Sequence, residues 1–528
     1  MGCFLSTSKD TGGNRRRPGN IGEVSVYVPG LRIPKPVDFS QSLGDNLSKN
    51  MVERLSALRT RIVVMAAQEG PTITRTRRKS ATQHGGSTLA DLHQALEDYL
   101  PVLLGLVKDG SQLQYKVQFV WVNQEDEAEE TAISNAWYEV LSVLHLMAML
   151  SLSQANLLLL PRTSADGYQP KVSEESRRAS VDIFLKAAGY LDCAVRHVLP
   201  QMSPELRREL PVDLAEGDLR ALCLQALGQG VDIQLGMAID STKATLAVKR
   251  RLACEMVKYW QQARTFLAAQ RTVEVMILKF RVTKPMCELL AIVAQDNIMN
   301  LPLANGWGEK HKLFVKWKYF EAKAAAYYYH GLILDEGNTE KFHGMAVAAL
   351  QAADEYFKES KKACEAFNAA PPLSRCFQSP RLISVLISHC YNSNLIVEFY
   401  FKKVVGEWQS PNLFFNSLSP PKFELGCPLE HTHTDTIISF LVLDRNPPLW
   451  GTMKYLSEKI PKDTSSKVRI NRDLYSYEKI METAPTLPDF ALALKPDEFQ
   501  LPPVHPSWTD ENMNRGQAGA NQPKGDRG

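Results

Sequence analysis

Residues 316–331 read KWKYFEAKAAAYYYHG, and residues 342–357 read FHGMAVAALQAADEYF. The apolar members of the second stretch recur every three or four positions, and they are Phe342, Met345, Ala349, Ala353, Tyr356 and Phe357. This spacing predicts one apolar face on a helix. Gly337-Asn338 indicates a turn between two helices over 309–334 and 340–367. Two antiparallel helices with a short link are typical of a tetratricopeptide-type unit, so the sequence predicts a helical-repeat core.

The same helical spacing of apolar residues continues outward from this pair. It predicts helices that begin at Leu89, a helix over 179–199 and two helices within 219–268. Two shorter stretches, Glu23–Val28 and Lys116–Val122, combine alternation or β-branched and aromatic residues and predict strands. We therefore expect a mainly α protein with a small β-sheet near the N-terminus.

Composition narrows the class of protein. The chain has 528 residues, of which 44% are hydrophobic and 23% charged, which is typical of a soluble globular protein. The net charge of +3 does not favour a nucleic-acid partner. Nine cysteines without a CxxC pair favour reduced thiols in the cytoplasm. The most apolar stretch, Ala136–Leu160, contains Glu139 and His145, so we expect a buried helix rather than a membrane span.

Several segments lack the helical pattern. Residues 1–20 are predicted to be flexible, 68–88 to form an exposed basic loop, 409–450 to form a Pro-rich insertion, and 509–528 to be a disordered tail. The prolines between Pro485 and Pro506 favour an extended segment that lies along the domain.

The first residues, Met1-Gly2-Cys3-Phe4-Leu5-Ser6, fit the pattern for N-myristoylation at Gly2. Cys3 next to it can take a palmitoyl thioester. One myristoyl chain binds a bilayer only marginally, whereas two acyl chains anchor a protein stably. The basic residues Lys9, Arg15, Arg16 and Arg17 follow, and each can add about 1 kcal/mol near anionic lipid. We therefore predict a cytoplasmic protein that lies on an anionic endosomal or plasma membrane surface.

Three stretches together resemble the BRO domain of the Alix and Brox proteins. They are Tyr99–Leu106 leading into Lys116–Trp121, residues 316–331, and Tyr477-Glu478-Lys479-Ile480 followed by Ala484-Pro485. The resemblance covers residues 21–508 and is closest to the short Brox-like members. It implies an elongated, boomerang-shaped, mainly α domain with a tetratricopeptide-like helical core.

The resemblance also implies a function. BRO domains are adaptors, not enzymes, and bind the C-terminal amphipathic helix of an ESCRT-III filament subunit in a groove, acting in endosomal sorting or membrane remodelling. Such recognition uses apolar anchors along one face of the partner helix. The positions that match the groove are Glu174, Arg178, Ile233 and Leu246, with Val248 and Leu252 as neighbours. No cofactor, nucleic acid or small-molecule substrate is implied.

Each groove position also has a structural interpretation. Glu174 and Arg178 can form an ordinary i, i+4 surface pair worth roughly 0.2–0.5 kcal/mol. Ile233 and Leu246 can belong to the core. The residues alone leave these alternatives open.

Two further groups of residues have side chains suited to metal binding or to modification. Cys427, His431, His433 and Asp435 have metal-binding side chains, but they lie in the Pro-rich insertion without a second cysteine pair, so we expect a solvated loop and no metal site. Ser80 and Ser180 each follow basic residues and are candidate phosphorylation sites.

The sequence is compatible with two other functions. One is a helical-repeat scaffold that holds a signalling or cytoskeletal partner at the membrane without ESCRT contact. The other is a hydrolase with an unrecognised site, for instance around His431 and His433. A deep polar pocket with perturbed titratable groups would favour the hydrolase.

Overall fold

The structure is a computed structural model that describes residues 26–69, 85–108, 112–123, 126–159, 172–280, 306–337, 342–370, 452–474 and 483–508. They belong to one compact unit, formed by Val24–Leu373 and Leu449–Gly528. The predicted segments 1–20, 409–450 and 509–528 lie outside the described residues, as do residues 70–84 of the predicted basic loop.

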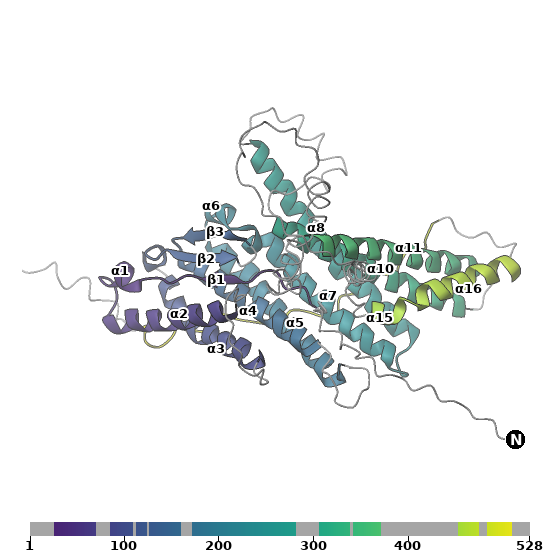
Figure 1. Ribbon diagram of the computed structural model, residues 1–528, viewed down its shortest axis with the longest axis horizontal. Helices are drawn as coiled ribbons and strands as arrows, with labels where there is room; N and C mark the ends of the chain where they lie inside the picture. The colour runs from purple at the N-terminus through teal and green to yellow at the C-terminus, as the bar shows by residue number, and fades with distance from the viewer. Residues whose placement is uncertain are drawn as a thin grey trace, which may run out of the picture. The chain divides into compact units, whose positions relative to one another are not determined.

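Helices account for most of the described chain, which confirms the mainly α prediction (Figure 1). The α-helices are α1 (Phe39–Leu43), α2 (Lys49–Glu69), α3 (Gly85–Leu103), α4 (Ala136–Leu159), α5 (Glu174–Cys193), α6 (Pro204–Glu209), α7 (Glu216–Asp240), α8 (Leu246–Phe280), α10 (Gly306–Glu336), α11 (His343–Ala369), α15 (Met453–Leu456) and α16 (Lys459–Leu474). Short 3-10 or π turns are η1 (Leu104–Val107), η2 (Gln112–Tyr115), η3 (Ala194–Val198), η4 (Leu199–Gln201) and η5 (Val212–Leu214).

A small antiparallel sheet has the strand order β1-β2-β3. The strands are β1 (Arg32–Pro34), β2 (Phe119–Asn123) and β3 (Asp126–Ile133), with Ile33 opposite Val122 and Trp121 opposite Thr131. The small sheet predicted near the N-terminus is therefore confirmed, and β2 overlaps the strand predicted over Lys116–Val122.

The prediction of a strand over Glu23–Val28 was wrong for residues 26–28, which the structure describes and which are not in the sheet. Val26 and Tyr27 are both buried, so the alternation did not correspond to one inner and one outer face. The Tyr27 ring packs against His311 and Phe314 of α10. The backbone carbonyl of Tyr27 accepts a hydrogen bond from Gln225 Nε2 at 2.8 Å. Helices therefore take the place of neighbouring strands around this segment.

Helix α4 is long and apolar enough to cross a membrane, but 78% of its most apolar window is buried inside the protein. Its fully buried Glu139 pairs with Arg59 and accepts a hydrogen bond from Trp121 Nε1 at 2.7 Å. A buried charge needs such partners. The prediction of a buried helix is confirmed.

A second buried ion pair joins the sheet to the helices. Arg32 of β1 lies 2.9 Å from Asp213 of η5 and donates to the Tyr138 hydroxyl of α4 at 3.1 Å. Asn123 of β2 donates to the same aspartate at 3.2 Å. These bonds fix the sheet against the start of α7.

The predicted helix pair is confirmed as α10 and α11, which pack along their length, with α16 beside α11 (Figure 1). The rings of Tyr327 and Tyr356 stack across the pair at 5.5 Å. The Thr464 hydroxyl of α16 donates to the Leu350 carbonyl of α11 at 3.0 Å.

The last described segment, residues 483–508, has no helix or strand and is tied to α3, α5 and α8 by hydrogen bonds. We call it the strap. The extended segment predicted between Pro485 and Pro506 is confirmed.

Candidate functional site

Helices α5, α7 and α8 carry all six positions predicted to line a partner groove. Ser173 caps α5, because its hydroxyl accepts a hydrogen bond from Ser176 N–H at 3.0 Å. Residues 241–245 turn the chain between α7 and α8. Arg177, early in α5, reaches Asp240 at the end of α7 at 2.7 Å. The start of α5, the end of α7 and the start of α8 therefore meet at one end of the three-helix layer.

Glu174 and Arg178 lie at this end on the outer side of α5. Their side chains are 61% and 70% exposed and 2.5 Å apart. Such an exposed pair contributes less than about 1 kcal/mol to stability. Both side chains are accessible to an incoming partner.

The three candidates on α8 divide between two sides of the helix. Val248 is 46% exposed and Leu252 is half-buried. The i, i+4, i+7 and i+11 spacing places both on one stripe with Glu255 and Tyr259. Leu246 is two residues from Val248, so its side chain points about 200° away around the helix. Val248 and Leu252 are brought together, and Leu246 is not.

Leu246 instead shares a stripe with Arg250, which is one turn further along α8. The Arg250 guanidinium lies 3.4 Å from His330 Nδ1 on α10. Leu246 is half-buried and packs against the core on that side. It is thus placed toward the α10 side rather than with Val248.

Ile233 of α7 is only 4% exposed and belongs to the hydrophobic core. A side chain this buried offers a partner almost no contact area. Ile233 is therefore a core residue, and its assignment to the partner groove needs correction. The next residue, Gln234, is half-buried and lies one turn from Gly230 on the side of α7 toward the strap.

We define the groove face by its exposed or half-buried residues on the three helices, which are Glu174, Arg178, Gln234, Val248 and Leu252. The face is amphipathic: two aliphatic side chains on α8 lie across from a charged pair on α5. Asp240 lies at one end of this face and accepts hydrogen bonds from Arg177 and from the Tyr455 hydroxyl, the latter at 3.0 Å. These bonds link α5, α7 and α15.

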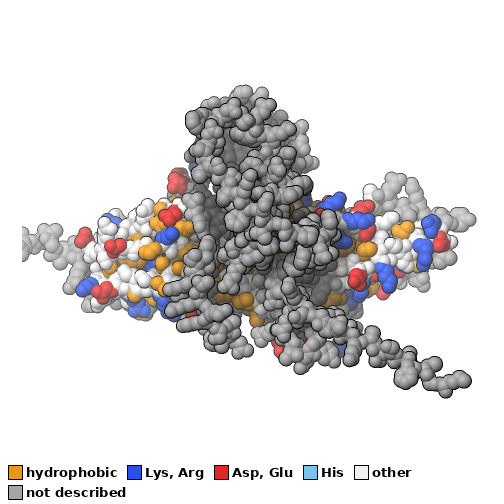
Figure 2. Space-filling view, in the orientation of Figure 1, with side chains coloured by type: hydrophobic (Ala, Val, Ile, Leu, Met, Phe, Trp, Pro, Cys, Tyr) orange, Lys and Arg blue, Asp and Glu red, His pale blue; other side chains and the backbone are white. Residues whose placement is uncertain are grey.

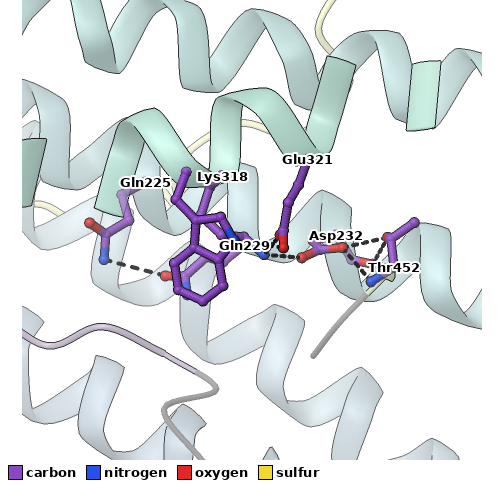
Figure 3. Close-up of polar contacts among 7 residues, drawn as sticks. Gln225, Gln229, Asp232, Lys318, Glu321 and Thr452 are labelled. Carbon is purple, nitrogen blue, oxygen red and sulfur yellow. Dashed lines mark hydrogen bonds and ion pairs between the residues drawn. The ribbon is translucent and has the colours of Figure 1, made fainter. Parts of the chain in front are cut away.

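A buried charged cluster holds α7, the helix between α5 and α8, in place (Figure 3). Asp232 lies 3.1 Å from the Lys318 ammonium of α10, and Lys318 lies 2.5 Å from Glu321. Asp232 also accepts hydrogen bonds from the Thr452 backbone N–H at 3.0 Å and from its hydroxyl at 2.5 Å. Trp317 Nε1 donates to Glu321 at 2.8 Å. α7 is thereby fixed to α10 and to the residue that precedes α15.

Two carboxylates share one ammonium in this cluster. Burial alone would lower the pKa of Lys318, but Asp232 and Glu321 outweigh it and raise that pKa. Burial raises the pKa of Glu321, against the attraction of Lys318. The groups are satisfied by one another and by backbone, so the cluster supports α7 rather than an open reaction site.

Ser180 does not fit its predicted role as a phosphorylation site. It is fully buried, and its hydroxyl donates to the Arg177 carbonyl at 2.7 Å. A kinase cannot reach it while α5 is packed. Ser80 lies outside the described residues, as do the lipidation candidates Gly2 and Cys3, the basic residues Lys9, Arg15, Arg16 and Arg17, and the cluster of Cys427, His431, His433 and Asp435.

A hollow of about 570 Å³ lies between α11 and α16. Both signs of charge are interspersed over these helices (Figure 2). Its acidic and basic walls include Asp354, Glu355, Lys358, Arg469 and Arg472, and Lys358 is paired with Asp354 at 2.8 Å. Across the described part of the chain, no group of three His, Cys, Asp or Glu side chains is arranged to hold a metal ion.

Comparison with solved structures gives weak overall similarity. A Bro1 domain described as a basis for endosomal targeting is 14% identical and aligns over 93% of this chain and 95% of its own, with a TM-score of 0.46. The ALIX BRO1 domain in complex with CHMP4C is 14% identical over 92% and 99%, with a TM-score of 0.46. ALIX in complex with a viral late domain is 16% identical over 71% of this chain and 46% of ALIX, with a TM-score of 0.43.

No curated protein matches the sequence. The model of the BRO1-like domain family matches residues 28–378, which is more than half of the chain and includes α5, α7, α8, α10 and α11. The chain belongs to the BRO1-like domain family.

Proposed function

We propose that this chain is a non-enzymatic, membrane-anchored adaptor that docks the C-terminal amphipathic helix of an ESCRT-III filament subunit on the groove face. Val248 and Leu252 take the apolar side of that helix, and Glu174 and Arg178 contact charged residues at its edge. The adaptor acts in endosomal sorting or membrane remodelling.

The docking proposal rests on one observation: exposed Val248 and half-buried Leu252 share one stripe of α8, across α7 from the exposed Glu174–Arg178 pair. Aliphatic side chains on one helix with charged side chains two helices away match the apolar and polar sides of an amphipathic helix. Family membership supports the same partner, since the ALIX BRO1 domain forms a complex with CHMP4C.

The test of docking is a titration of a fluorescent CHMP4C tail peptide with the full chain and with V248D/L252D. Two apolar anchors buried in an interface contribute about 1.5–3 kcal/mol each, so we expect affinity to fall by at least tenfold. The matched control is Val64→Asp on α2, a residue that is 51% exposed and lies on another helix. Equal affinity for all three chains would refute the assigned face. A variant at Ile233 would be uninformative, since a buried aspartate destabilises the fold.

For the membrane anchor we propose myristoylation of Gly2 and palmitoylation of Cys3, strengthened by Lys9, Arg15, Arg16 and Arg17. Gly2→Ala should release a tagged protein to the cytosol, and Cys3→Ser should shorten its residence on membranes. Gly12→Ala is the matched control and should leave the protein in place. Unchanged membrane residence of Gly2→Ala would contradict the anchor.

A further inference from the structure

The strap has an extended, two-sided pattern where it crosses the three helices. Between Asp489 and Asp497 the side chains alternate, so that Phe490, Leu492, Leu494 and Pro496 are half-buried and the intervening residues are exposed. The inner hydrophobic residues pack against the core. Alternation with period two is the property of an extended chain lying on a surface.

The strap is held across α8 and α7 by specific contacts. The Glu255 carboxylate, on α8, accepts hydrogen bonds from the backbone N–H of Ala493 at 2.6 Å and Leu494 at 3.0 Å. The Tyr259 hydroxyl donates to the Leu494 carbonyl at 2.5 Å. Leu494 sits against Gly230 of α7, where a Cβ would lie 3.2 Å from its Cδ1 atom. The Leu494 side chain therefore lies on α7 near Phe184 and Val181 of α5, while its backbone is bound to α8.

On α5 the strap contacts the continuation of the groove face. The Asp497 N–H donates to the Leu185 carbonyl at 3.1 Å, and Gly189 allows the close approach of the Asp497 carbonyl. Glu174, Arg178, Leu185 and Gly189 follow one another at helical spacing on one side of α5. The strap thus covers the side of α5 whose first turns are open.

α8, like α5, has an accessible first part and a following part that the strap covers. Its stripe begins with Val248 and Leu252, which are accessible, and continues with Glu255 and Tyr259, which bind the strap. From Arg178 to Leu185 is seven residues, or about 10 Å of helix at 1.5 Å per residue. A partner helix with anchors at i, i+3, i+4 and i+7 spans the same seven residues, so it fills this accessible length. Any longer helix lying along this face meets the strap.

The middle of the strap lies on the surface of the helices and buries no side chain fully. Of its residues only Pro485 and Trp508, near its two ends, are buried, and residues 486–507 are all half-buried or exposed. Trp508 donates to the Val102 carbonyl at 2.9 Å, so the far end stays fixed to α3 when the middle lifts. Local opening of the middle exposes no fully buried strap side chain, but it breaks the bonds to Glu255 and Tyr259, and a partner helix has to offset that cost.

We infer that the strap is an intramolecular competitor, in which Ala493–Asp497 covers the continuation of the groove face and must lift before the whole partner helix can dock. This inference rests on the proposed function. When only a minor fraction of molecules has the groove open, the apparent affinity is reduced by that fraction. Partner binding and strap release are then one coupled equilibrium.

The test compares the full chain with Leu494→Asp, which places a charge against α7 and weakens the strap. In a titration of fluorescent CHMP4C tail peptide, we expect Leu494→Asp to bind on the order of tenfold more tightly, as for a strap that is closed in roughly 90% of molecules. Ala491→Asp is the matched control, because it adds the same charge at an exposed strap position. It should bind like the unmodified chain.

Hydrogen exchange on the full chain gives the second readout. With saturating peptide, the amides of Ala493, Leu494 and Asp497 should exchange at least tenfold faster than without it. Slower or unchanged exchange, or equal affinity of Leu494→Asp and the unmodified chain, overturns the competition while leaving the proposed function intact. If no chain binds the peptide, the proposed function fails and the competition fails with it.

Discussion

Trp508 packs so closely on Gly105 that a Cβ at residue 105 would come within 1.9 Å of the indole Cε2 atom. The indole is 6% exposed and hydrogen-bonds to the Val102 carbonyl near the end of α3. Residues near a helix C-terminus leave carbonyls without helical partners, and the strap supplies donors to them. His505 N–H donates to the Pro101 carbonyl at 3.0 Å in the same way. The strap therefore completes α3.

Gly105→Ala should detach this end of the strap. The added methyl group displaces the indole, and overpacking of this kind destabilises a fold by about 1–3 kcal/mol. Urea denaturation would measure the loss, and tryptophan emission should shift to longer wavelength as Trp508 becomes hydrated. Gly308→Ala is the control, since its new Cβ would have its nearest neighbour 4.0 Å away. A Gly105→Ala protein as stable as the unmodified chain would contradict the packing.

Lys318→Met should be strongly destabilising, because it leaves Asp232 and Glu321 buried without their shared cation. Removing one partner of a buried pair typically lowers the free energy of unfolding by about 3–5 kcal/mol. Adding Glu321→Gln removes one of the uncompensated charges and should recover part of the loss. Urea titrations of the single and double variants check this. A double variant less stable than Lys318→Met alone would contradict the electrostatic account.

Acidification should weaken the fold through buried histidines. Burial lowers the pKa of His145 to about 4, against an ordinary value of 6.5. Between these values the unfolded chain binds a proton that the folded chain does not, so stability falls as pH decreases from 6.5 toward 4. A difference of this size corresponds to about 3 kcal/mol for one group. Burial likewise lowers the pKa of His311, to about 3, which adds to the same trend.

Unfolding free energies measured between pH 7.5 and 4.5 would check this, because His145→Leu should flatten the pH dependence. His197→Gln, at an exposed position on the surface, should leave it unchanged. An identical slope for His145→Leu and the unmodified chain would contradict the assignment of the effect to His145.

Ser180 should resist phosphorylation in the folded protein. A basic-directed kinase incubated with native and with denatured chain should label Ser180 only in the denatured sample, as read by mass spectrometry of the tryptic peptides. The reason is the burial of its hydroxyl against the Arg177 carbonyl. Rapid labelling of Ser180 in native protein would show that α5 opens more easily than its packing implies.

The fold was largely predictable from local pattern. The α10–α11 pair, the division of 219–268 into two helices, β2 and the extended strap all follow from periodicity, turn residues or proline spacing. The strand predicted at residues 23–28 failed because Val26 and Tyr27 are both buried by helices distant in sequence. Alternation alone cannot reveal that kind of contact.

The candidate site was less predictable, because a single position in a helix can face a partner or the core. Ile233 and Leu252 are both aliphatic, yet one is buried and the other half-exposed. What separates them is the packing of α7 under α5 and α8, and this depends on Asp232 and Lys318, which are 86 residues apart. The period-two pattern of Phe490, Leu492 and Leu494 was visible in the sequence and could have indicated that the strap lies on a surface.

Site-specific photocrosslinking tests the central claim most directly. A benzophenone amino acid at position 248 should capture the CHMP4C tail peptide, with the crosslink mapping to the apolar side of the peptide helix. The same amino acid at position 64, also exposed, should capture little. Efficient capture at 64 and none at 248 would contradict docking on the groove face.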